Sequence, residues 1–134
     1  MKRIGLFLLL IALPLSGCDS AKAVEGCTDP NALNFNASAE DDNNSCIYQA
    51  EVSFYMTTDI HGLVEIAVDG VFLGVLDGVY SAQPGSCNQP FTVTLDGRAS
   101  AAGNRFRWTA TGQDGVVIGG EELFRRGCSF VRVF

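Results

Sequence analysis

From residue 50 to residue 134 the sequence is divided into short runs in which apolar and polar residues alternate, and this pattern constrains the fold most strongly. Alternation with a period of two puts the apolar side chains on one face of a strand. Runs of strand length occur at residues 52–56, 64–68, 71–76, 91–95, 106–110, 116–118 and 128–134. Turn-forming residues separate them, and residues 119–126 have room for one helical turn at most. The sequence predicts a mainly β fold: a small antiparallel sandwich of about seven strands.

The side chains expected to face the core follow from the same alternation. They are Val52, Phe54 and Met56, then Val64, Ile66 and Val68, then Phe91, Val93 and Leu95, and finally Phe106, Trp108 and Ala110. Asp69-Gly70 lies between two of the runs and is the strongest short signal for a hairpin turn.

The first 17 residues have the pattern of a cleaved export signal. Two cations, Lys2 and Arg3, precede an apolar run from Ile4 to Leu13 that is too short to cross a bilayer as a helix. The tetrapeptide at residues 15–18, Leu-Ser-Gly-Cys, resembles the lipobox of bacterial lipoproteins. This resemblance implies a signal helix that is removed after residue 17 and a lipid, of the palmitate kind, on Cys18. The alternatives are an ordinary signal peptide with an incidental cysteine, or an uncleaved anchor.

The lipobox resemblance also implies a location. Two or three acyl chains on Cys18 hold a protein stably on a membrane, whereas one chain does so only marginally. The expected location is the bacterial cell envelope, with the outer membrane or cell surface favoured. The inner membrane stays open because Asp19 follows the cysteine directly, and an aspartate there retains lipoproteins in the inner membrane of some bacteria.

The charge of the chain excludes several partners. The full sequence has nine Lys and Arg against 15 Asp and Glu, and loss of Lys2 and Arg3 with the signal leaves seven cations and a net charge of −8. Nucleic acid and anionic lipid headgroups are poor partners for such a surface.

The five cysteines are Cys18, Cys27, Cys46, Cys87 and Cys128. If Cys18 carries lipid, four remain for two disulfides in an oxidising compartment. Four cysteines allow three connectivities.

Residues 26–48 form a segment rich in Asp and Asn that begins Gly-Cys-Thr-Asp-Pro and ends Ser-Cys-Ile-Tyr. The segment resembles a short cysteine-loop repeat, G-C-T-D-P…D-D-x-S-C-x-Y, of secreted and surface proteins of bacteria. Asn44 stands where the repeat commonly has glycine, and asparagine tolerates the left-handed backbone of such a turn. The resemblance implies a Cys27–Cys46 bond, which contributes about 3 kcal/mol in the chain-entropy model.

This acidic segment has two interpretations. Its oxygen-bearing side chains are Asp29, Asn31, Asn34, Asn36, Asp41 and Asp42. Calcium prefers six to eight oxygen ligands, so these residues are a candidate calcium site, although their spacing is not that of an EF-hand. Alternatively, Asp and Asn here form side-chain-to-backbone turns in a spacer that its disulfide holds together.

Residues 49–134 resemble a small β domain that accompanies such cysteine-loop repeats. The resemblance includes a recurring pair of cysteines, which implies a Cys87–Cys128 bond between the loop at residues 84–90 and the last strand. The expected domain organisation is a signal peptide at 1–17, a lipidated tether at 18–25, the cysteine-loop module at 26–48 and the β-sandwich module at 49–134.

The sequence offers no convincing catalytic site. His61 is the only histidine and is expected in a solvated turn, and neither a nucleophile motif nor a phosphate-binding loop occurs. Arg105 and Arg107 are expected to pair with Glu121 or Glu122 on the exposed face of the sheet. The chain is therefore expected not to be an enzyme.

Two classes of function fit these observations. The first is a non-catalytic structural or binding module displayed at an envelope membrane, with an envelope protein or glycan as partner. The second is a binder of a small ligand or glycan that uses the sandwich loops, with Tyr55 and Phe124 as candidate exposed aromatics, and inhibition of a hydrolase is a further alternative. Contiguous exposed aromatic side chains on one sheet face would favour glycan binding.

Overall fold

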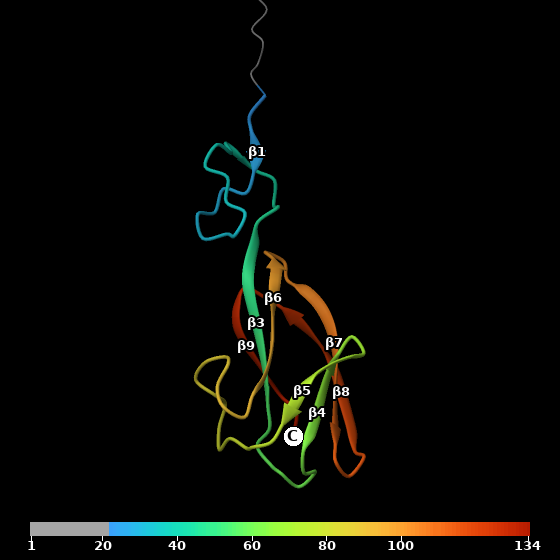
Figure 1. Cartoon of the computed structure of the whole chain (residues 1–134). Coiled ribbons are helices and arrows are strands. Elements are labelled where there is room, and N and C mark those ends of the chain that lie inside the picture. The colour runs from blue at the N-terminus through green and yellow to red at the C-terminus, as the bar shows by residue number, and fades with distance from the viewer. Residues whose placement is uncertain (1–21) are drawn as a thin grey trace, which may run out of the picture.

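The computed structural model describes residues 22–134, and Figure 1 shows the course of the chain. The expected signal segment and Cys18 lie outside the described residues. Within the described range the regular elements are strands, and none of its segments is a helix with the length and hydropathy to span a membrane.

Seven strands form two sheets that pack face to face, which confirms the expected sandwich. The three-stranded sheet has the order β6 (Val93–Ser100), β3 (Ile47–Tyr55), β9 (Gly127–Arg132). The four-stranded sheet has the order β5 (Val71–Leu76), β4 (Val64–Val68), β7 (Asn104–Gly112), β8 (Val117–Phe124). Asp69 and Gly70 both have positive φ, as the predicted hairpin turn between β4 and β5 requires.

The pairing departs from the predicted antiparallel pattern at one place. β3 pairs with β6 in the antiparallel sense but with β9 in the parallel sense, with Ala50 opposite Gly127. The chain reaches β9 from β8 in the other sheet, so no hairpin turn forces β9 to run against β3.

The core lies between the two sheets, and Phe54 is at its centre. Phe54 is fully buried, and the rings of Phe106 and Trp108 meet it edge-on at centroid distances of 6.4 and 6.0 Å. Every residue predicted for the inward faces of the first, second and fifth strands is buried. Alternation therefore identified most of this core.

Phe91 was expected at the start of the fourth inward face, and this expectation is wrong. β6 begins at Val93, whereas Phe91 has a φ of 62° and is 54% exposed. A bulky residue rarely adopts this left-handed conformation, which belongs to turns and strained loops.

Residues 119–126, for which one helical turn at most was expected, form no helix, and β8 occupies this segment as far as Phe124. Gly119 and Gly120 allow β8 to lie close to β7. A Cβ at Gly120 would come within 3.0 Å of Trp108 Nε1, and a Cβ at Gly119 within 2.7 Å of the Trp108 carbonyl oxygen. The glycines therefore serve close strand packing rather than a helical turn.

The cysteine-loop module lies at one end of the molecule, before β3 (Figure 1). It contains two short parallel strands, β1 (Glu25–Gly26) and β2 (Asp41–Asp42). A small buried cluster of Cys27, Ala32, Cys46 and Tyr48 fills its centre. β3 begins at Ile47, inside the range expected for this module, so one strand passes from the module into the sandwich.

Candidate functional site: a clamped loop on the three-stranded sheet

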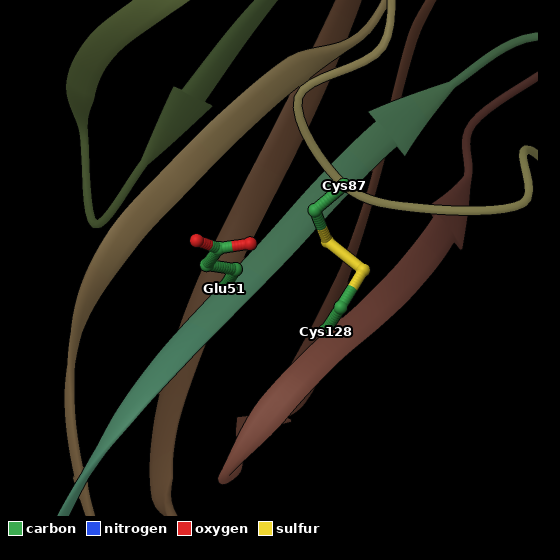
Figure 2. Close-up of side chains that lie close together, drawn as sticks. All are labelled: Glu51, Cys87 and Cys128. Carbon is green, nitrogen blue, oxygen red and sulfur yellow. A yellow bond between two sulfur atoms is a disulfide. The ribbon is translucent and has the colours of Figure 1, made fainter.

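The longest connection in the sandwich is residues 77–92, between β5 and β6. It links the two sheets and lies against the outward face of the three-stranded sheet, where a disulfide joins Cys87 to Cys128 of β9 (Figure 2). Irregular connections of this length are uncommon in compact domains and are often functional. This loop is therefore the candidate functional site.

Hydrogen bonds hold the middle of the loop against β3 and β6. Asn88 N lies 3.3 Å from both Ser53 Oγ and Thr94 Oγ1, and these two hydroxyls are hydrogen-bonded to each other. Ser53 is on the outward face of β3, yet it is fully buried because the loop covers it. A buried hydroxyl needs such partners, so these contacts fix the position of the loop.

The first part of the loop is held by Tyr80. Its backbone N donates a 2.9 Å hydrogen bond to Met56 O, and its hydroxyl donates to Pro90 O. Its ring meets Tyr55 edge-on at 6.4 Å, and Tyr55 meets Phe130 of β9 at the same distance. The loop is thus attached by a disulfide, hydrogen bonds and aromatic contacts, and we call residues 77–92 the clamped loop.

The end of the loop presents Phe91 to solvent. Its ring lies over Gly78, where a Cβ would come within 2.5 Å of Phe91 Cγ. Gly78 is therefore required for this arrangement. Val79, beside Gly78 in the chain, is 46% exposed, so the fixed loop carries two exposed apolar side chains.

Glu51, Cys87 and Cys128 bring one carboxylate oxygen and two sulfurs within 4.8 Å of one another (Figure 2). Among residues 22–134 no other group of three His, Cys, Asp or Glu side chains is this close. Metal binding by cysteine needs thiolates, and both sulfurs are joined in the disulfide. In this oxidised form the cluster offers a metal only the carboxylate.

Most residues of the candidate calcium site make local hydrogen bonds through their side chains. Asn34 accepts from Ile47 N and donates to Ser45 O. Side-chain oxygens of Asp29, Asn36 and Asp42 each accept from a backbone N two residues further along the chain. These bonds support the interpretation as turns in a spacer, while calcium binding stays a prediction.

Asp29 also joins the cysteine-loop module to the sandwich. It accepts a 2.8 Å hydrogen bond from the Tyr48 hydroxyl and lies 3.3 Å from Arg126, in the turn between β8 and β9. The hydrogen bond from the Asn31 backbone N–H is the main cause of the lowered pKa of Asp29, and the bond from the Tyr48 hydroxyl is the second cause. The Tyr48–Asp29 hydrogen bond in turn raises the pKa of Tyr48. Arg126 lies over the Tyr48 ring, 4.6 Å from its centroid. We call this set, Asp29, Tyr48 and Arg126, the inter-module contact.

His61 is less solvated than its turn sequence suggested. Its side chain is 19% exposed, its Nδ1 lies 2.9 Å from Asp114 Oδ2, and its ring contacts Phe134 at 4.3 Å. The hydrogen bond with His61 is the main cause of the lowered pKa of Asp114. Asp114 and Phe134 are distant in sequence, so no local pattern could have found this cluster, which ties together three segments at the end of the sandwich.

The other predicted surface residues have mixed outcomes. Arg105 and Arg107 both pair with Glu121, at 2.7 and 3.6 Å, as expected, and Arg105 is the main cause of the lowered pKa of Glu121. Tyr55 and Phe124 are each only 7% exposed, so they are packing residues and not an exposed aromatic face.

Comparison with protein-family models, curated proteins and solved structures finds no match to this chain. Among the described residues the aromatic side chains that are largely exposed are Phe35, Phe72 and Phe91. They belong to the cysteine-loop module, β5 and the clamped loop, so they do not form one contiguous sheet face.

Proposed function

We propose that this chain is a lipid-anchored lipoprotein of the bacterial cell envelope that acts as a non-catalytic display module. Cys18 carries the lipid at the outer membrane or cell surface. The cysteine-loop module is a stiff spacer, and the sandwich presents the loop at residues 77–92 to an envelope protein or glycan.

The observation that carries this proposal is the rigid connection between the cysteine-loop module and the sheet to which the clamped loop is attached. β3 starts in the module and continues through the centre of the three-stranded sheet. The inter-module contact adds a second link between module and sandwich. A fixed attachment of this kind keeps the distance and orientation of a displayed surface constant, which lowers the ordering cost of binding.

The clamped loop supports the choice of display surface. Its exposed side chains, Val79 and Phe91, stand on a backbone that the Cys87–Cys128 bond and the contacts of Asn88 hold in place. Exposed apolar side chains on a pre-ordered loop are suitable anchors for a partner. The separated positions of the exposed aromatic residues give the alternative of a glycan-binding sheet face no support.

Capture of binding partners from envelope extract tests the proposal. The protein with Val79→Ser and Phe91→Ser is expected to lose partners that the wild type retains. The matched control is Val71→Ser with Phe72→Ser, which also removes one exposed valine and one exposed phenylalanine, but from β5. Equal capture by the wild type and the loop variant would reject this loop as the display surface.

A further inference from the structure

Glu51 lies beside the disulfide that clamps the loop, and within the described part of the chain no cation forms an ion pair with it. Glu51 and Cys128 are direct neighbours in the β3–β9 register, and the Glu51 carboxylate lies within 4.8 Å of both sulfurs (Figure 2). The ion pairs among residues 22–134 do not include Glu51. Its other direct neighbour, in β6, is Asp96, which adds a second carboxylate on the same face.

The same disulfide is open to solvent on one side. Cys128 is exposed and Cys87 is partly exposed, whereas Cys27 and Cys46 of the other disulfide are only 1% and 4% exposed. Burial therefore protects the Cys27–Cys46 bond from reagents, but it does not protect the Cys87–Cys128 bond.

Reduction of a disulfide passes through two anions, and Glu51 disfavours both. The thiolate of a reductant forms a bond to one sulfur as the protein S–S bond breaks, and the electron pair leaves on the other sulfur as a thiolate that takes up a proton. A second reductant thiolate then attacks the mixed disulfide, which releases the second protein thiol and leaves the two reductant molecules joined as a disulfide. A carboxylate beside the bond repels the entering thiolate and destabilises the leaving one.

We propose that Glu51 protects the Cys87–Cys128 disulfide from reduction by thiols, and so keeps the loop at residues 77–92 clamped although Cys128 is exposed. The role follows from the position of the carboxylate and from the exposure of the bond. It does not depend on lipidation or on the identity of a partner.

The test compares reduction rates for the full chain with Cys18→Ser, with and without Glu51→Gln. The reductants are glutathione, which is anionic, 2-mercaptoethanol, which is neutral, and cysteamine, which is cationic. Free thiols are alkylated at intervals and assigned by peptide mapping. Glu51→Gln is expected to accelerate cleavage of Cys87–Cys128 by about four-fold with 2-mercaptoethanol, the factor that one charge about 5 Å away produces in water. The acceleration should be larger with glutathione and smaller with cysteamine.

Two controls separate charge from loosened packing. Glu65→Gln removes an exposed carboxylate from the other sheet and should leave the rate of Cys87–Cys128 cleavage unchanged. The rate of Cys27–Cys46 cleavage should be the same in every variant. Glu51→Lys should accelerate cleavage further, most strongly with glutathione. Wild-type rates in Glu51→Gln with all three thiols would overturn the proposal. Acceleration by one common factor, whatever the charge of the thiol, would also overturn it.

Discussion

Arg126 Nη1 lies 3.3 Å from Asp29 Oδ2, although 97 positions separate the two residues in the chain. The same guanidinium lies over the Tyr48 ring, whose hydroxyl donates to Asp29. The turn between the last two strands is thereby attached to the cysteine-loop module. This attachment has consequences for dynamics and for stability that can be measured separately.

Replacing Arg126 with Ala should loosen the module with little effect on global stability. Both partners of the ion pair are exposed to solvent, so the pair should contribute little to the free energy of unfolding. Heteronuclear NMR relaxation should show increased motion in residues 26–46, while the unfolding midpoint changes little. Arg125→Ala is the neighbouring control. Unchanged relaxation in Arg126→Ala would mean that β3 and the Cys27–Cys46 bond fix the module without this contact.

The lowered pKa of Asp29 predicts that the inter-module contact is lost in acid. A carboxylate whose pKa is lower in the folded than in the unfolded state stabilises the fold above the unfolded value, and this contribution disappears as the pH falls through the folded value. The Tm of the wild type should therefore exceed that of Asp29→Asn at neutral pH. The difference should shrink on acidification below about pH 4, the ordinary carboxylate range. A difference in Tm that stays constant from neutral to strongly acidic pH would contradict this prediction.

Phe54→Ala should destabilise the sandwich strongly. Phe54 is fully buried between the sheets and contacts Phe106 and Trp108, so its truncation leaves a cavity. Large-to-small changes of this kind cost about 3–5 kcal/mol. Chemical denaturation measures the loss. Val117→Ala, at an exposed position of β8, is the control and should change stability far less. A loss below about 1 kcal/mol for Phe54→Ala would show that this part of the core is not tightly packed.

Calcium should bind the acidic segment no tighter than about 1 mM, the weak end for exported sites. Asp29, Asn34, Asn36 and Asp42 already accept hydrogen bonds through side-chain oxygens, which leaves fewer lone pairs for a cation. Calorimetry of the wild type beside Asp41→Asn with Asp42→Asn measures any binding. A much tighter affinity that the double substitution removes would establish an ordered calcium site instead of a spacer.

Local sequence patterns predicted the elements that depend on local geometry. The alternating pattern correctly predicted that Val52 and Phe54 are buried, and Asp69-Gly70 correctly predicted the hairpin turn. Both signals depend only on residues that are neighbours in the sequence. The same signals located the seven strands of the sandwich, although β8 continues to Phe124, well beyond the predicted run at residues 116–118.

The features that were not predicted depend on contacts between distant segments. β9 pairs with β3 in the parallel sense, although the two strands are far apart in the sequence. Phe91 lies outside β6 and packs over Gly78. The burial of Ser53 results from the loop that covers it, and the contact of His61 with Asp114 joins two separate turns. Periodicity contains no information on any of these pairings.

The most direct test of the proposed function is mass spectrometry of the N-terminus of the mature protein, combined with membrane fractionation. The account predicts that the chain begins at Cys18, that this cysteine carries a diacylglyceryl group, and that Cys18→Ser is no longer recovered with the membrane. A mature chain with an unmodified Cys18, or a Cys18→Ser protein that remains membrane-bound and is processed at the same position, would contradict it.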